Sequence, residues 1–394
     1  MPLRRLHDAL QALSHVERRL EPFFREAVDS VLREPEAAVI QWLINIQRPN
    51  EGLALAEERL MPGEEEATQQ IIDRMHAQMA GRFKPGDFQR GGNTKTHGIV
   101  RAEFTVLDGL PDNLRKGVFA QPRTFKTWVR YAGPGPDVPN DIDDVGFGSM
   151  TLKLMGVEGP KLMDEEKFTQ DFLCVCTPTF VTPNSAANAV LQKWSLEHTP
   201  LWYFLDPRDS HVLDFLMQGL WNGTQYNPLG QTYYSCVPYL LGEGQAMKYA
   251  FLPRTKVTKR IPGVPFGDVP PNYLHDNMVK TLAEQDVEFD ICVQVQTDAH
   301  RMPIENAAVR WPLRLSPHVP VARLRIPKQV FDSEAQQVGF AKVLKYNPWH
   351  CLPDHRPLGN QSRTRQRLYY ELGKYRQQMN GVPHVEPTGD EVFG

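Results

Sequence analysis

The sequence predicts an α+β fold in which helices at both ends of the chain flank one large antiparallel sheet, with a closed barrel favoured. Three observations predict it. Apolar residues recur at helical spacing in roughly the first 80 residues, alternate with polar residues in segments between residues 98 and 326, and return to helical spacing between Ser362 and Gln378. Strands with one buried and one exposed face, spread over so long a stretch, indicate a single large sheet.

Two helices are expected before the sheet begins. In the first, Leu10, Leu13 and Leu20 recur at helical spacing. The second follows Pro62-Gly63 and runs from Glu64 to Met79. We therefore divide the chain into a helical N-terminal extension packed on the core, residues 1–84, and a barrel with C-terminal helices, residues 85–394. The apolar sides of these helices could also contact a partner subunit or lie on a membrane surface.

The strands carry the clearest pattern. From Val287 to Val295 every second residue is apolar, and the residues between are mostly acidic or amide side chains. Shorter segments of the same kind occupy residues 100–106, 150–154, 247–251 and 322–326. Residues 169–181 are nearly all apolar, which predicts a strand buried on both faces. The last helix is expected from Ser362 to Gln378, ending before Gly381.

Composition and charge exclude several classes of function. The formal net charge of −3 gives no positive field that would attract nucleic acid. The five cysteines include no CxxC pair, so we expect buried free thiols rather than disulfides or a zinc ribbon. The N-terminus lacks the apolar centre of a signal peptide, and a cytoplasmic location is expected. Phosphate-binding loops, nucleophile elbows and zinc-binding helices are absent from the sequence.

Two polar clusters carry candidate chemistry. His97, preceded by Thr96, stands where a loop enters the strand that begins near Val100, and such a histidine can act as a general base or a metal ligand. Arg365 and Tyr369 are four residues apart, so they share one face of the last helix. The positive charge of the arginine favours the phenolate form of the tyrosine, which is a hard anionic ligand suited to ferric iron.

A third cluster lies between residues 347 and 357. It contains four residues of types that bind metals, namely His350, Cys351, Asp354 and His355. Three prolines in the same segment impose a rigid, extended path, which hinders the convergence of four ligands. We therefore favour a packed loop with polar anchors over a metal site.

In this order the clusters resemble those of the catalase-related haem proteins, over residues 85 to 380 or so. The resemblance matches Thr96-His97 with the distal motif, Trp128-Val129-Arg130-Tyr131 with the arginine-containing strand, and Arg365 with Tyr369 as the proximal motif. Asn347-Pro348-Trp349-His350 is typical of the smaller catalase-related branch. The resemblance implies a catalase-like antiparallel β-barrel with N-terminal and C-terminal helices around a buried haem b, which contains ferric iron.

The resemblance also implies a role for each matched residue. Tyr369 would be the ligand of the iron, and Arg365 would keep it ionised. Arg130 would bind a haem propionate. His97 would move a proton between the two oxygens of a peroxide, and the hydroxyl of Thr96 would hydrogen-bond to it and set its tautomer or reach.

Two departures from the catalase pattern bear on the substrate. Ala132 stands where catalases carry a serine, and residues 174–178 contain no asparagine where catalases carry one. The pocket is thus predicted to be less polar than in catalases, with few polar side chains near His97 other than Thr96. A threonine before the distal histidine is similar to the branch that acts on fatty-acid hydroperoxides, the allene oxide synthase relatives.

Our leading hypothesis is an enzyme that uses haem to cleave the O–O bond of an organic hydroperoxide, with a fatty-acid hydroperoxide as the expected substrate. The alternatives are a small hydrogen peroxide catalase or peroxidase, a haem or lipid carrier without turnover, and a barrel protein without haem. The expected partner is thus a small-molecule hydroperoxide or a fatty acid, and no nucleic acid. Peripheral contact with a membrane and assembly into a homodimer are further candidates.

Overall fold

The computed structural model describes residues 2–135, 137–144 and 146–393, and its strands form a closed antiparallel barrel. Hydrogen-bonded neighbours follow the order β5-β4-β3-β2-β1-β9-β8-β7-β6, and an additional pairing of β5 with β7 closes a ring of eight strands that leaves β6 outside. The strands are β1 (Thr96–Val106), β2 (Thr124–Ala132), β3 (Ser149–Met155), β4 (Thr169–Val175), β5 (Tyr233–Tyr234), β6 (Tyr239–Leu240), β7 (Ala246–Pro253), β8 (Val287–Val295) and β9 (Val319–Ile326). The predicted fold class is confirmed.

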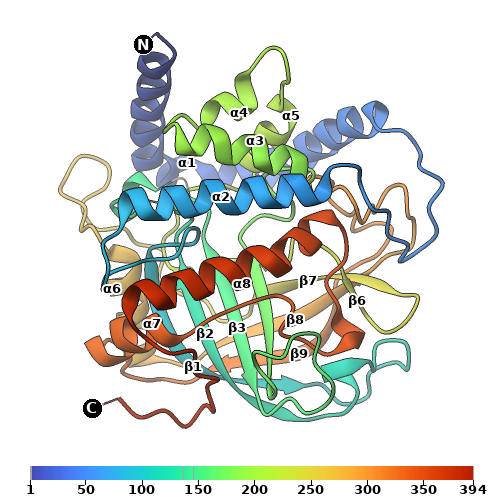
Figure 1. The fold of residues 1–394 in the computed structure, drawn as a ribbon. Coiled ribbons are helices and arrows are strands. Elements are labelled where there is room, and N and C mark those ends of the chain that lie inside the picture. The colour runs from blue at the N-terminus through green and yellow to red at the C-terminus, as the bar shows by residue number, and fades with distance from the viewer. Residues whose placement is uncertain (1, 136, 145, 394) are drawn as a thin grey trace.

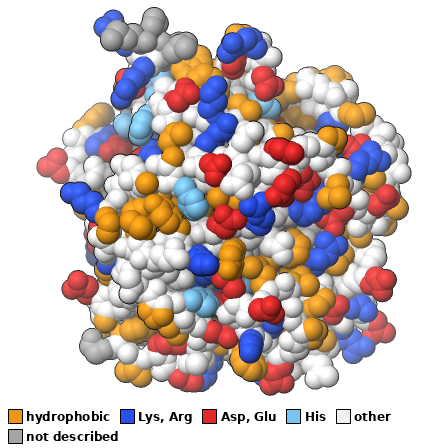
Figure 2. Space-filling view, viewed as in Figure 1, with side chains coloured by type: hydrophobic (Ala, Val, Ile, Leu, Met, Phe, Trp, Pro, Cys, Tyr) orange, Lys and Arg blue, Asp and Glu red, His pale blue; other side chains and the backbone are white. Residues whose placement is uncertain are grey.

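Helices cover one face and one end of the barrel. They are α1 (Pro2–Gln47), α2 (Glu64–Arg82), α3 (Ser185–Leu196), α4 (Leu201–Leu205), α5 (Val212–Gly219), α6 (Tyr273–Glu284), α7 (Ala341–Val343) and α8 (Asn360–Asn380). Figure 1 shows α2 and α8 crossing the same face of the barrel, with α1 and α3 to α5 gathered above them. Ile71 and Met79 of α2 are buried in one apolar cluster with Leu368 and Leu372 of α8. Figure 2 shows acidic and basic side chains intermingled over this face.

The interior of the barrel is a filled core. Val100 and Phe104 of β1 are fully buried in it together with Phe289 of β8, while Glu103 on the opposite face of β1 is exposed. This is the alternation that the sequence predicts. The prediction of one strand over residues 169–181 is too long, because β4 ends at Val175 and the chain then enters bends before α3.

Helix α1 turns its charged side toward the body of the protein. Glu21 is 2% exposed, and its carboxylate accepts a hydrogen bond from the backbone N–H of Thr224 (2.7 Å) and pairs with Arg18 (3.0 Å). The large apolar side chains on the other side are exposed, among them Leu13, Val16, Phe23, Val31, Val39, Trp42 and Ile46. Toward the C-terminal end of the helix, Ala37 and Ile44 are buried in an apolar cluster with Met217 and Val309. Helix α1 therefore contacts the body of the protein through both ion pairs and a few apolar side chains.

The exposed side of α1 bears on two further expectations. None of the helices in the described part of the chain is both long and apolar enough to cross a bilayer. Contact with a membrane surface or with a second copy stays a prediction, as does the division of the chain at residue 84.

A buried ion network ties the segment before α8 to the barrel. Lys153 of β3 pairs with Glu166 and with Asp171 of β4 (2.7 Å to Asp171), and none of the three is exposed by more than 2%. His350 meets the carboxylates of Asp171 and Glu165, each at 3.1 Å. Glu166, Asp171 and His350 lie close enough together to hold a metal ion, but the amino group of Lys153 already provides the cation there.

The predicted polar anchors of this segment are confirmed. The backbone N–H of Gly117 donates to the carboxylate of Asp354, and that of Val118 donates to Nε2 of His355, both at 3.0 Å. The five cysteines are free and buried, as the sequence predicts. The segment before α8 is thus fixed to the barrel wall, and this fixes where α8 begins.

The ion network predicts a loss of stability in alkaline solution. Burial alone would lower the pKa of His350, but hydrogen bonds to Asp171 and Glu165 raise it to about 10. A group whose pKa is raised by folding stabilises the protein fully below its unfolded pKa of about 6.5, and this contribution is lost as the pH rises through about 10. Urea denaturation at pH 6, 8 and 10 should show the free energy of unfolding falling across this range. His350→Gln should be less stable at pH 6 and should lose this part of the slope, and an unchanged slope would contradict the assignment.

Candidate functional site

His97 is the extra residue of a β-bulge in β1. Thr96 pairs with Ala132 of β2 and Gly98 pairs with Tyr131, so two steps along β1 match one step along β2. A bulge bends its strand and re-aims a side chain. It explains how a residue inside a regular strand can present its imidazole to a pocket while remaining 2% exposed.

The neighbours of the bulge hold it in place. A methyl group on Gly98 would lie 2.7 Å from the terminal carbon of Met278, so glycine at this position allows α6 to pack closely against the bulge. Nδ1 of His275, also on α6, donates a hydrogen bond of 2.8 Å to the carbonyl oxygen of His97. Helix α6 therefore fixes the backbone of the bulge.

The imidazole of His97 is neutral at physiological pH. Burial is the largest cause that lowers its pKa, followed by the positive charges of Lys95 and Arg130, and the pKa falls to about 3. A neutral imidazole has a free nitrogen lone pair, so His97 can accept a proton from a bound molecule.

Arg130 of β2 connects the two halves of the predicted site. Its guanidinium donates two hydrogen bonds to the hydroxyl of Thr96, at 3.1 and 2.8 Å, and one of 2.6 Å to the carbonyl oxygen of Asn93. The phenol of Tyr369 on α8 partly opposes the lowering of the Arg130 pKa. Within the described residues the hydroxyl of Thr96 is bonded to Arg130 and makes no hydrogen bond to the ring of His97. A catalytic role for Thr96 stays a prediction.

Arg130 belongs to a cluster of three arginines that the sequence analysis did not anticipate as a group. Arg90 and Arg376 both donate to the carbonyl oxygen of Leu344, each at 2.8 Å. Burial lowers the pKa of Arg130 and of Arg376, and repulsion by Arg90 lowers both further. In the described part of the chain no carboxylate lies within ion-pair distance of any of the three. Such a cluster suits an anionic ligand, because buried charges need partners.

One of the missed arginines has a signal in the sequence. Arg376 follows Tyr369 by seven residues, which is two helical turns, so it lies on the same face of α8 as Arg365 and Tyr369. Arg90 lies in the loop before β1, where no periodic pattern points to it.

Arg365 and Tyr369 form the pair that the sequence predicts. The central carbon of the Arg365 guanidinium lies 5.3 Å from the ring centre of Tyr369. Burial opposes the charge of Arg365, but the nearby phenols of Tyr369 and Tyr239 raise its pKa above the usual value. The Tyr369 ring is half-buried against the apolar cluster between α2 and α8. A buried positive charge thus stands beside an accessible phenol.

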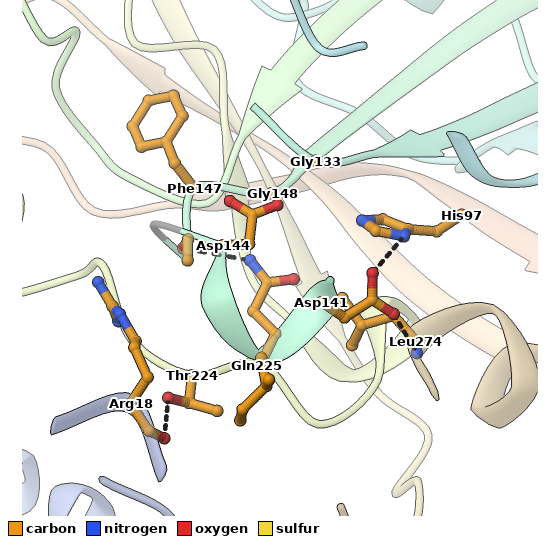
Figure 3. A pocket seen from close by; sticks show the side chains of 12 residues that line it. Arg18, His97, Gly133, Asp141, Asp144, Phe147, Gly148, Thr224, Gln225 and Leu274 are labelled. Atoms are coloured by element: carbon orange, nitrogen blue, oxygen red, sulfur yellow. Dashed lines mark hydrogen bonds and ion pairs between the residues drawn. The ribbon is translucent and has the colours of Figure 1, made fainter. Parts of the chain in front are cut away.

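A small pocket opens beside His97 (Figure 3). It is lined by Arg18 of α1, His97, Gly133, Asp141, Ile142, Asp144, Gly146, Phe147, Gly148, Thr224, Gln225 and Leu274. A methyl group on Gly133 would lie 3.3 Å from Nε2 of His97 and 2.6 Å from a carboxylate oxygen of Asp144, so both groups border this glycine. The prediction that few polar side chains lie near His97 is wrong. Its polar neighbours come from segments between the strands, where no sequence motif identifies them.

Comparisons with known proteins give a match for the fold but none for the sequence. No family model and no curated protein matches the sequence. A fungal catalase structure matches 88% of this chain over 70% of its own length, with 14% identity and a TM-score of 0.59. Catalase A from Saccharomyces cerevisiae matches 88% of the chain over 72% of its length, with 14% identity and a TM-score of 0.61. A bacterial catalase matches 86% over 67%, with 13% identity and a TM-score of 0.53.

The chain has the catalase fold. At these identities the similarity establishes the fold alone. Within this catalase fold, β1 supplies His97 and α8 supplies Tyr369, and Arg130 of β2 donates to the hydroxyl of Thr96 beside His97.

Proposed function

We propose that the chain is a haem enzyme that cleaves the O–O bond of an organic hydroperoxide, with a fatty-acid hydroperoxide as the expected substrate. The observation that carries the proposal is the position of Arg130. This arginine contacts the neighbour of His97, the phenol of Tyr369 acts on its pKa, and it belongs to a largely buried cationic cluster that has no acidic partner among the described residues. An anionic cofactor held by Arg130 would have a proton acceptor and an oxygen ligand within reach.

The residues present fit ferric haem b. Its two propionates would supply the anionic partners that Arg90, Arg130 and Arg376 lack among the described residues. The phenol of Tyr369 is a hard oxygen ligand, and the charge of Arg365 beside it favours an anionic oxygen. When bound, haem would supply an iron centre able to give the peroxide the electrons that break its O–O bond.

The protein itself would move the proton. Nε2 of the neutral His97 accepts the proton from the O–H group of the hydroperoxide and delivers it to the other oxygen, which bears the carbon chain. Proton delivery makes that oxygen a better leaving group. Gln225 and Asp144 line the same pocket and can orient the peroxide by hydrogen bonding.

The lining of the pocket supports an organic substrate. Ile142, Phe147 and Leu274 give it apolar walls, which suit a carbon chain. Burial raises the pKa of the Cys176 thiol to about 12, so this residue, which lies in the segment without an asparagine, is neutral.

Hydrogen peroxide is the second candidate substrate, because Asp144 and Gln225 keep part of the pocket polar. The two candidates predict different results for Ala132→Ser. If the native substrate is an organic hydroperoxide, the added hydroxyl should raise hydrogen peroxide turnover by about tenfold, the effect of one well-placed hydrogen bond. If the native substrate is hydrogen peroxide, the change should be small. Stopped-flow rates with both peroxides measure it.

One experiment tests the proposed function. The purified protein should show a Soret band, and it should consume a fatty-acid hydroperoxide faster than it releases oxygen from hydrogen peroxide. Vigorous oxygen release without preference for the lipid substrate would favour the catalase alternative. Retained haem or lipid without turnover of either peroxide would indicate a carrier. A protein that stays colourless after haem is added would refute every hypothesis that involves haem.

A further inference from the structure

The second ring nitrogen of His97 faces a carboxylate. Nδ1 is buried and makes no hydrogen bond to a described residue. A carboxylate oxygen of Asp141 lies 3.7 Å from it. Figure 3 shows the two side chains facing each other. Asp141 is the one described acidic residue within ion-pair distance of this ring. The separation is slightly longer than a hydrogen bond, as is common in active sites before a ligand binds.

Asp141 is held rigidly in this position. Its second carboxylate oxygen accepts a hydrogen bond of 2.7 Å from the backbone N–H of Leu274, and the oxygen nearest His97 lies 2.6 Å from Nζ of Lys95. Its own backbone N–H donates to the carbonyl oxygen of Pro271 at 2.9 Å. Lys95 is itself anchored by the carbonyl oxygens of Pro139 and Pro271. The carboxylate is thus fixed from both its backbone and its side chain.

Other groups near the ring do not offer Nδ1 an acceptor. The hydroxyl of Thr96 is taken by Arg130, and Ala132 and Gly133 have no polar side-chain atom. Besides Asp141, the described titratable groups around His97 are Lys95, Arg130 and His275. Asp144 lies on the side of Nε2.

A neutral imidazole carries one proton, and a carboxylate beside Nδ1 places that proton on Nδ1. Nε2, which borders Gly133 and the pocket, is then the nitrogen with the free lone pair. We propose that Asp141 is a positioning residue that accepts the Nδ1 proton of His97 and thereby keeps Nε2 ready to take a proton from the substrate. The proposal rests on the function proposed above for its catalytic consequence, but the hydrogen bond itself does not depend on haem.

The tautomer of His97 is the decisive measurement. In the full-length protein as purified, ¹⁵N-labelled at histidine, two-bond ¹H–¹⁵N correlation spectra distinguish the two tautomers, and His97→Gln identifies the signal. We expect the proton on Nδ1 in the wild type. Asp141→Asn keeps an acceptor for Leu274 and offers an N–H to Nδ1, so the proton should move to Nε2. A wild-type proton on Nε2, or the same tautomer in both proteins, would overturn the proposal.

Turnover supplies the second readout. Asp141→Asn should lower kcat for the hydroperoxide by about 100-fold or more, with little change in KM, because a wrong tautomer cannot accept the proton. Asp143→Asn, in the same short helix η2 (Asp141–Asp143) but half-buried, is the matched control and should keep wild-type kinetics. An unchanged kcat in Asp141→Asn, with turnover intact in the wild type, would refute the catalytic role of Asp141 alone.

The two proposals can fail separately. If the protein binds no haem and consumes no peroxide, the proposed function fails, and the wild-type tautomer still decides whether Asp141 holds Nδ1. If Asp141→Asn does not fold, the wild-type spectrum remains sufficient, since a proton on Nε2 there contradicts the contact.

Discussion

A Tyr369→Phe variant should purify with little or no haem. The phenol oxygen is the ligand we assign to the iron, and its loss should weaken haem binding on the order of 100-fold, at the upper end of what supporting residues of metal sites contribute. The fold should persist, because phenylalanine keeps the ring that packs between α2 and α8. The pyridine haemochrome content and the Soret band of the purified variant measure the effect.

The neighbouring residue provides the control. Tyr370 is more exposed, at 37%, and lies about 100° further round α8. Tyr370→Phe should therefore bind haem as the wild type does. Equal haem content and identical spectra in wild type and Tyr369→Phe would show that Tyr369 is not the ligand.

The second large effect is expected at His97. His97→Gln should retain haem but lose hydroperoxide turnover by about 10²- to 10⁴-fold, the range that a positioned acid–base group contributes. Glutamine is uncharged and similar in length, so the buried position accepts it, but its amide cannot take up a proton at physiological pH. Single-turnover rates with a fatty-acid hydroperoxide measure the loss.

His211→Gln is a suitable control for this variant, since His211 lies at the start of α5, where it pairs with Asp214 (3.2 Å). It should leave turnover unchanged. Should His97→Gln turn over hydroperoxide at the wild-type rate, the proton must move through another group, and Asp144 would be the first to examine because it borders the same glycine.

The regular elements could be predicted from the sequence because each carries its own period. The alternation in Val287–Val295 and the helical spacing after Ser362 identify β8 and α8 to within two residues. The closure of the barrel could not be read in this way. Strands β5 and β6 contain two residues each, which is too short for any pattern.

Half of the candidate site could likewise be predicted from the sequence. Arg365 and Tyr369 share a helix face, and His97 stands at a strand mouth, so local spacing marks them. Asp141 and Asp144 come from the segment between β2 and β3, and only the folded chain brings them to His97. The charged inner side of α1 was missed for a different reason. Helical periodicity shows that a helix has two sides, but it does not reveal that charged residues such as Arg18 and Glu21 pair on the side that meets the protein.

The pairing of β1 with β9 has a consequence for how the chain folds. Glu103 lies opposite Arg325, so this seam of the barrel joins residues that are 222 positions apart in the chain. Contacts of such sequence separation form late, because the entropy of closing the intervening loop must be overcome first. Until β9 is synthesised and docked, β1 presents an unpaired edge that can associate with other chains. Expression yield should therefore depend on temperature and chaperones, and a chain that ends before β9 should aggregate rather than form a smaller barrel.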